Sequence, residues 1–236
     1  MKYFIDTEFI EGFHKPLFGK RRHFIDLISI GIVAEDGREY YAISNEYRYK
    51  DADKWVQDNV ILPMYIDRVH GDARNRWDVH NFHHAFGKSN EQIKLEILEF
   101  MGCWRDTFKW RVMSNNVPGI YAYFADYDWV AFCSLFGRMV DLPEGFPMYC
   151  IDLKQTLDEK SLLLTDERVR RPIYNLSGVW KDSPWGNESA TIFNCTADEK
   201  IKLIKAHPKY PAQEKEHISI ADARWDKKLY EFLQTI

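Results

Sequence analysis

The first 45 residues alternate short apolar runs with turn residues, a pattern typical of β-strands. Lys2–Thr7 is a nearly continuous apolar run, as expected for a buried strand. A longer run over residues 24–34 is rich in Ile, Val and Leu, and the turn signal at 35–37 leads to a third strand at 38–44. Glycine and proline within residues 9–23 predict a loop. The chain is therefore expected to open with three antiparallel strands.

Further along, the pattern changes to helical periodicity with isolated strands. Ser89 followed by Gln92 is a capping box, which predicts a helix to about Met101. A strand at 119–124 leads into a helix at 126–136, and an apolar stripe predicts a final helix at 217–233. The other expectations are short helices at 52–62, 64–70 and 197–206, a short strand at 148–153, irregular chain at 71–88, and an inserted excursion at 160–196.

This order of elements predicts one α/β domain over residues 1–236. A mixed β-sheet flanked by helices, the ribonuclease H-like plan, accommodates a β-β-β-α-β-α-β-α order. A length of 236 residues suits one sizeable domain with insertions. We expect those insertions at about 46–88 and 138–214, where they extend a substrate groove or a subunit contact.

Composition and charge exclude several classes of protein. A net charge of −4 argues against broad, non-specific adhesion to nucleic acid. Two basic runs, Gly19–His23 and Arg168–Arg171, either hold a nucleic-acid strand locally or form solvated loops. The four cysteines show no CxxC spacing, so a structural zinc site is not expected. No apolar run approaches the roughly 18 residues of a membrane span, and the first residues predict a strand rather than a signal peptide, so a cytoplasmic protein is expected.

Four acidic residues and one histidine carry the candidate chemistry. Asp6 and Glu8 lie two positions apart at the end of a predicted strand, so both carboxylates point to the same face. Asp128 lies near a predicted strand–helix junction, and His217 and Asp222 lie at the start of the final helix. Converging carboxylates repel one another unless a cation lies between them, and Mg²⁺ and Mn²⁺ prefer oxygen ligands. With a histidine as base, such a set is equipped for metal-assisted phosphodiester hydrolysis.

These motifs together resemble a known group of enzymes. DTE at the end of the first strand, YD early in the mid-chain helix and H-x₄-D near the C-terminus resemble the DEDDh 3′→5′ exonucleases. Within that group, the segments YFIDTEFIE, LISIGIVAEDGREYYAIS and YDWVAFCSLFG are most similar to the adenylate-preferring exoribonucleases of mycobacterial type, ribonuclease AS. The likeness covers roughly residues 1–45, 89–137 and 215–236.

The resemblance implies a role for each of the five residues. Asp6 would bridge two Mg²⁺ or Mn²⁺ ions, and Glu8 would bind the ion that holds the attacking water. Asp222 would complete that first site, and Asp128 would hold the second ion. His217 would take the proton from the water. Two ions about 3.5–4 Å apart would then stabilise both the attacking and the leaving oxygens.

Neighbouring residues compete for some of these roles. An aromatic residue usually precedes the mid-chain aspartate of the family, which favours Asp128 over Asp126; the latter is expected to be the helix N-cap. Asp226 is set aside because its spacing from His217 does not fit H-x₄-D. The family often has an asparagine shortly before the mid-chain aspartate, and this chain departs from that pattern with Phe124.

The substrate is less determined than the chemistry. Phe9 follows Glu8 and is a candidate to stack on the terminal base or sugar, with burial in the core as the alternative. The resemblance implies single-stranded RNA degraded from its 3′ end to nucleoside 5′-monophosphates, with adenylate-rich ends as candidate substrates, and a homodimer whose subunits share the RNA surface. Residue chemistry alone does not separate RNA from DNA, because that depends on contact to the 2′-hydroxyl. A DNA exonuclease, a catalytically silent binding domain and a metal-free glycosidase are the alternatives.

Overall fold

A five-stranded mixed sheet forms the centre of the molecule. The computed structural model describes residues 1–14, 18–69, 76–107, 109–113, 117–163 and 196–236. The strand order is β3-β2-β1-β6-β7. β1 is antiparallel to β2, β2 is antiparallel to β3, and β6 runs parallel to both β1 and β7. The strands are β1 (Lys2–His14), β2 (Arg22–Ala34), β3 (Glu39–Ile43), β6 (Gly119–Ala122) and β7 (Ile151–Asp152).

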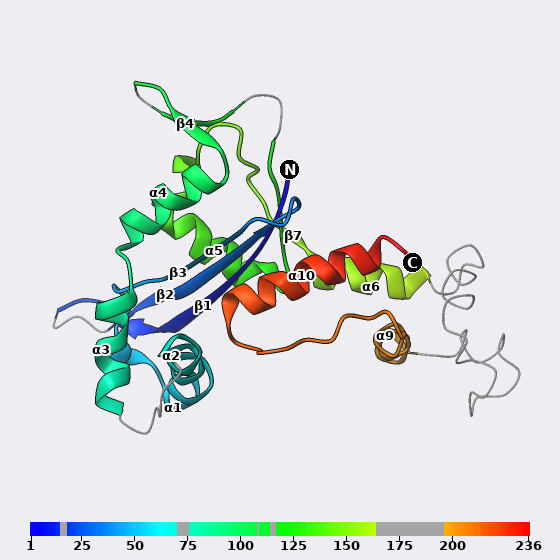
Figure 1. Ribbon diagram of the computed structural model, residues 1–236, viewed down its shortest axis with the longest axis horizontal. Coiled ribbons are helices and arrows are strands. Elements are labelled where there is room, and N and C mark those ends of the chain that lie inside the picture. Colours follow the sequence, from blue (N-terminus) through cyan, green and yellow to red (C-terminus); the bar gives the residue numbers. More distant parts are fainter. Residues whose placement is uncertain (15–17, 70–75, 108, 114–116, 164–195) are drawn as a thin grey trace, which may run out of the picture.

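Helices cover both faces of this sheet (Figure 1). On one face lie α4 (Asn90–Phe100) and α5 (Ala125–Phe136); on the other lie α10 (Ser219–Leu233) and α6 (Leu153–Leu163). Side chains alternate along β1, so Tyr3 and Ile5 enter the core on the α4–α5 face while Phe4 joins the core with α10. The predicted α/β class is confirmed, and the strand order is compatible with the ribonuclease H-like plan.

Smaller elements surround the sheet. α1, the π-helical turn and α2 follow one another without a break and gather with α3 at one end of the sheet (Figure 1). α9 packs against α6. Within the described residues no helix is long and apolar enough to cross a membrane. The bounds are a 3₁₀ turn (Tyr49–Asp51), α1 (Lys54–Val56), the π-helical turn (Gln57–Ile61), α2 (Leu62–Val69), α3 (Arg76–Phe86), β4 (Cys103–Arg105), β5 (Trp110–Val112), a 3₁₀ turn (Met139–Asp141) and α9 (Ala197–Lys205).

A close approach between α10 and β2 brings the C-terminal helix onto the sheet. Gly31 of β2 lies opposite Asp6 of β1. A Cβ at Gly31 would lie 2.3 Å from the carbonyl oxygen of Ser219, the first residue of α10. The hydroxyls of Ser29 and Ser219 are hydrogen-bonded at 3.0 Å in the same buried contact. The helix therefore begins directly over the sheet because position 31 has no side chain.

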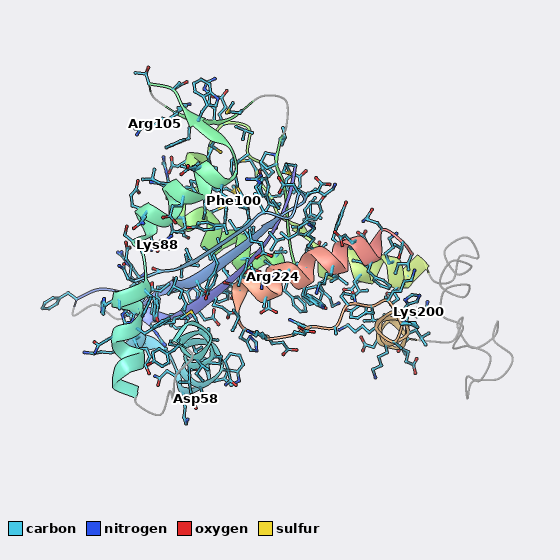
Figure 2. All side chains as sticks on the ribbon, viewed as in Figure 1. Asp58, Lys88, Phe100, Arg105, Lys200 and Arg224 are labelled. Carbon is cyan, nitrogen blue, oxygen red and sulfur yellow. The ribbon has the colours of Figure 1, made fainter. Side chains whose placement is uncertain are left out.

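A surface ion pair holds the outer side of the same helix. The Nε of Arg224, labelled in Figure 2, donates to a carboxylate oxygen of Glu39 on β3 at 2.8 Å. Both side chains are exposed, so this pair contributes at most about 1 kcal/mol. The buried packing of α10 against β1 and β2 is the larger contribution to its position.

Two predictions about local structure were wrong for residues that the structure describes. Residues 9–14 and 22–23 are strand rather than loop, because β1 continues to His14 and β2 begins at Arg22. Gly12 lies opposite Phe24, whose ring lies 3.0 Å from where a Cβ would be, so the glycine makes room for a cross-strand aromatic side chain. Residues 76–86 are helical rather than irregular. Of the predicted excursion, 160–163 ends α6, while residues 164–195, including the basic run at 168–171, lie outside the described part of the chain.

The expected N-cap of the mid-chain helix was also wrong. The cap residue of α5 is Phe124, not Asp126, and its side chain accepts no capping hydrogen bond. Instead, Asp152 at the end of β7 accepts a hydrogen bond from the backbone N–H of Ala125 at 3.3 Å. A neighbouring strand, rather than a local residue, therefore caps the helix that carries Asp128.

Replacing Gly31 tests the close approach of α10. Gly31→Ala should lower the free energy of unfolding by about 1–3 kcal/mol, because the new methyl group overlaps helix backbone that has to shift. Gly119→Ala is the matched control, since its Cβ would meet only the ring of Tyr121, at 3.1 Å. Urea unfolding of both variants measures the difference. Equal losses would show that α10 tolerates a side chain at position 31.

Candidate active site

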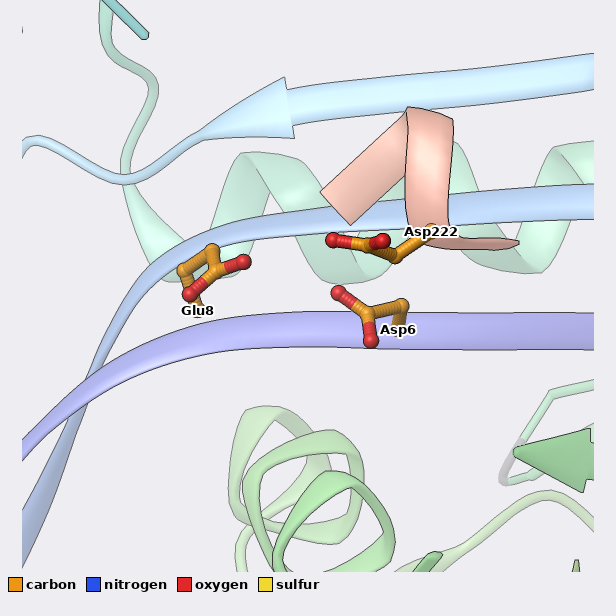
Figure 3. Close-up of side chains that lie close together, drawn as sticks. All are labelled: Asp6, Glu8 and Asp222. Carbon is orange, nitrogen blue, oxygen red and sulfur yellow. The ribbon is translucent and has the colours of Figure 1, made fainter. Parts of the chain in front are cut away.

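Three carboxylates from two elements converge at the middle of β1. Asp6 and Glu8 project from β1, and Asp222 projects from the first turn of α10, so that the three side chains face one another (Figure 3). One oxygen from each lies within 4.8 Å of the oxygens of the other two. The i, i+2 spacing on β1 and the packing of α10 on Gly31 together produce this cluster.

Asp128 lies beside the cluster and is held by β1 itself. Its Oδ1 accepts hydrogen bonds from the backbone N–H and the hydroxyl of Thr7, both at 2.7 Å. Thr7 lies between Asp6 and Glu8 in the strand, so the aspartate is held against the same segment of β1. Asp128 is buried, and its charge raises the pKa of both Asp6 and Glu8. The structure therefore brings all four predicted acidic residues into one region.

The electrostatics of this cluster oppose ionisation. Burial, followed by the charges of Asp128 and Glu8, raises the pKa of Asp6 well above its usual range. Burial and the neighbouring carboxylates raise the pKa of Glu8 to about 8. Burial raises the pKa of Asp128 to about 7 against the opposing effect of the bonds from Thr7. The pKa of Asp222 is also raised, mainly by burial. Without a compensating positive charge, the cluster therefore retains protons near neutral pH.

The donor set fits a hard divalent cation. Every candidate ligand is a carboxylate oxygen, the type that Mg²⁺ and Mn²⁺ prefer. Asp6 Oδ2 is buried and accepts no hydrogen bond from the described residues. A buried carboxylate oxygen without a donor is costly, and a cation removes that cost. Asp6, Glu8, Asp222 and Asp128 are therefore the residues available to hold metal.

His217 is positioned by its backbone. Its φ angle is +67°, a left-handed conformation that is uncommon outside glycine. Its N–H donates to Asp222 Oδ2 at 2.8 Å, while Gln213 Nε2 donates to Oδ1 at 2.7 Å. Asp222 thus fixes the loop that carries the histidine, and that loop fixes the aspartate in return. The imidazole lies edge-on to the indole of Trp55, with ring centroids 5.0 Å apart.

Aromatic side chains border the carboxylates. Phe9 is partly buried and its ring stacks on that of Tyr127, with centroids 5.3 Å apart and planes inclined by 8°. Tyr127 is 46% exposed. Phe124 has φ +58° and an exposed ring, which is an unusual conformation for a bulky residue and marks local strain beside the site. Phe9 is therefore not fully buried in the core, and one face of its ring is covered by Tyr127.

Asp226, which the spacing argument set aside, lies close to the predicted residues. It is one turn beyond Asp222, is 1% exposed, and accepts a hydrogen bond from the backbone N–H of Tyr123 at 3.2 Å. Burial and the charge of Asp128 raise its pKa well above the usual range. The hydrogen bond from Tyr123 to Asp226 attaches the end of β6 to α10. The i, i+4 spacing from Asp222 was the signal that placed both on one helix face.

The fold and site define an α/β protein with a carboxylate centre suited to divalent cations. Two proteins of Mycobacterium tuberculosis are similar to this chain: 3′-5′ exoribonuclease Rv2179c of strain ATCC 25618 / H37Rv and 3′-5′ exoribonuclease MT2234.1 of strain CDC 1551 / Oshkosh. Each is 34% identical over 160 residues, which is 68% of this chain and 76% of the relative. No family model matches the chain. At this identity and coverage, the chain belongs to the same 3′-5′ exoribonuclease family.

The raised pKa values predict opposite effects of pH on the metal-free and metal-bound protein. The pKa of Glu8 is about 8 in the folded chain and near its ordinary value of 4.5 when unfolded, so the folded state holds the proton more tightly. The stability of the metal-free protein should therefore fall as pH rises from about 4.5 to 8. Mn²⁺ or Mg²⁺ at about 100 times Kd should raise Tm by about 5–10 °C, more at pH 8 than at pH 6.

The control for this prediction is a second glutamate. Glu8→Gln should flatten the fall in stability with pH and reduce the rise in Tm on adding Mn²⁺. Glu159→Gln, the same change at an exposed residue of α6, should alter neither. Thermal unfolding with EDTA and with added ion measures both effects. A pH-independent metal effect that survives in Glu8→Gln would place the ion elsewhere.

Proposed function

We propose that this chain is a metal-dependent 3′→5′ exoribonuclease of the DEDDh type on a ribonuclease H-like fold. It hydrolyses single-stranded RNA from the 3′ end and releases nucleoside 5′-monophosphates. The observation that carries the proposal is the convergence of oxygens of Asp6, Glu8 and Asp222 within 4.8 Å. Membership of a 3′-5′ exoribonuclease family supports the direction and the substrate class.

Hydrogen bonds from the protein hold two of the carboxylates, whereas one oxygen of Asp6 accepts none from the described residues. Asp128 is anchored by Thr7, and Asp222 by Gln213 and the N–H of His217. Asp6 lies beside both of them, its pKa raised by burial and by the charges of Asp128, Glu8 and Asp222, and its Oδ2 accepts no hydrogen bond from the described residues, which suits it to hold metal. When bound, two divalent cations would supply the charge that stabilises the attacking and leaving oxygens of an in-line displacement.

His217 is the residue proposed to accept the proton of the attacking water. Its ring belongs to a loop that Asp222 holds through the backbone N–H, so a ligand and the base are fixed relative to one another. The indole of Trp55, whose centroid lies 5.0 Å from that of the imidazole, restricts the imidazole on one side. A general base of this kind contributes roughly 10²–10⁴-fold to the rate.

The aromatic border supports binding of an unpaired 3′ end. Phe9, which follows Glu8 in the chain, stacks on the partly exposed ring of Tyr127, and bases stack on aromatic rings without strict sequence preference. Adenylate-rich ends, suggested by the sequence resemblance, are the first substrates to try. A homodimer stays a prediction from the same resemblance.

The assay for this function uses 5′-labelled single-stranded oligo(A) RNA and the DNA of the same sequence, each with Mg²⁺, Mn²⁺ or EDTA. We expect stepwise shortening of the RNA from its 3′ end, lost in EDTA and in Asp6→Ala because the central ligand is removed. Preference for DNA would make the protein a DNA exonuclease of the same chemistry. Cleavage that persists in EDTA would contradict a metal mechanism, and no cleavage of either strand would favour a binding domain.

The base is tested at its unusual backbone position. His217→Asn should lower kcat by roughly 10²–10⁴ while keeping the fold, because asparagine tolerates a left-handed conformation but cannot accept the proton. His84→Asn, at an exposed histidine of α3, is the control and should have wild-type activity. Circular dichroism and Tm verify that both variants are folded. Full activity of His217→Asn would remove the histidine from the mechanism.

A further inference from the structure

β1 and β2 continue past the sheet as a two-stranded ribbon. β6 pairs only with residues 2–4 of β1, and β3 only with residues 29–33 of β2, whereas β1 and β2 stay paired as far as His14 and Arg22. We call residues 9–14 and 18–27 the arm. The register shifts between Glu8 and Phe9, so the arm starts at a bulge next to the carboxylates. In Figure 1 it is the blue ribbon that extends beyond α3.

The base of the arm is firmly attached. Ile10 is 2% exposed and packs in a buried cluster with Ile28 and residues of α2 and the π-helical turn. The guanidinium of Arg48 lies 4.4 Å from the centroid of Phe24, and its Nε donates to Asp26 at 3.3 Å. The arm is therefore a fixed extension of the active-site strand, with a span of about 20 Å for the six residues 9–14.

The outer half of the arm exposes aromatic and basic groups together. Phe13 is 54% exposed and Phe18 is 88% exposed. The guanidinium of Arg21 lies 3.9 Å from the centroid of the Phe13 ring. Lys20 and Arg22 are exposed, and residues 18–23 contain three lysine or arginine side chains and no acidic residue, in a chain of net charge −4. Glu11 of the arm lies 3.5 Å from a nitrogen of His23.

We propose that this arm binds single-stranded RNA on the 5′ side of the nucleotide being removed. The inference rests on the proposed function. Cations attract the phosphates, and exposed rings and guanidinium planes offer stacking surfaces, which is the combination that binds unpaired nucleic acid. The arm leaves the same strand that carries Asp6 and Glu8, so RNA whose 3′ end lies at the carboxylates is within reach of it. A short RNA would not contact the arm.

Binding is measured first, with cleavage prevented. The variant is Lys20→Ala/Arg21→Ala/Arg22→Ala, and fluorescence anisotropy in EDTA follows a labelled oligo(A) of about 20 nucleotides. Removal of three phosphate contacts should reduce the salt dependence, the slope of log K against log [salt], by about 2. Lys202→Ala/Lys205→Ala/Lys209→Ala removes the same charge from exposed positions in and just after α9 and should keep the wild-type slope. An unchanged slope in the arm variant would overturn the proposal.

Cleavage then separates the arm from the catalytic site. In Mg²⁺, the arm variant should lose about ten-fold or more in kcat/KM on the long RNA and keep its kcat/KM on a trinucleotide. Phe13→Ala/Phe18→Ala should weaken binding of the long RNA by about ten-fold without changing the salt slope, since only stacking is removed. Equal losses on both lengths would mean that the arm acts on catalysis instead, and would overturn the proposal.

The remaining outcomes distinguish the arm from the proposed function. If the wild type does not hydrolyse RNA but the slope in EDTA falls in the arm variant, the exoribonuclease proposal fails and RNA binding by the arm stands. If the wild type hydrolyses RNA and the slope is unchanged in the arm variant, the exoribonuclease proposal stands and RNA binding by the arm fails. Sedimentation velocity tests whether a second copy of this chain binds the arm instead of RNA. A dimer that dissociates in the arm variant while RNA binding stays intact would make the arm a contact between copies, and would overturn the proposal.

Discussion

The contact between α10 and β2 at Gly31 is the constraint on which the site depends. Because residue 31 has no side chain, the backbone of Ser219 comes directly onto the strand, opposite the position of Asp6. That places Asp222, in the first turn of α10, over the carboxylates of β1. Asp128 likewise lies in the first turn of α5. Both helices therefore direct their N-terminal ends toward the cluster, where the helix dipole partly offsets the negative charge.

The cluster combines strong mutual repulsion with selective anchoring. Protein hydrogen bonds hold the outer carboxylates, Asp128 and Asp222, so their orientation does not depend on a bound ion. The central carboxylate, Asp6, has a buried oxygen that accepts no bond from the described residues, and burial and the charges of its neighbours raise its pKa. Either a proton or a cation can relieve this arrangement. The protein therefore fixes the orientation of the outer carboxylates, while a bound proton or cation balances the negative charge of the cluster.

Local sequence patterns predicted those parts of the structure that local interactions determine. The strand that carries Asp6 and Glu8, the turn after β2, and the cap at Ser89, whose hydroxyl accepts from the N–H of Gln92, are confirmed, although the strand continues to His14 instead of ending at the two carboxylates. Features created by distant residues were missed. Asp152 caps α5 from another strand, and the contact of Trp55 with His217 joins residues 162 positions apart in the chain. Gly12, which suggested a loop in the arm, is compatible with a strand because the side chain of Phe24 on the partner strand fills the space.

The paired strands β1 and β2 therefore carry two chemically opposite surfaces. Asp6 and Glu8 of β1 present acidic side chains that would repel a phosphate chain in the absence of cations, whereas the arm presents Phe13 beside the basic side chains of Arg21 and Arg22. A net negative protein that acts on RNA needs such a separation, because uniform positive charge would bind RNA anywhere on its surface. Phosphate and stacking contacts on the arm do not depend on base identity, so an RNA held there can shift by one nucleotide and meet the same groups again. Base-independent contacts on the arm, together with carboxylates held in fixed orientations at the site, therefore suit repeated removal of terminal nucleotides.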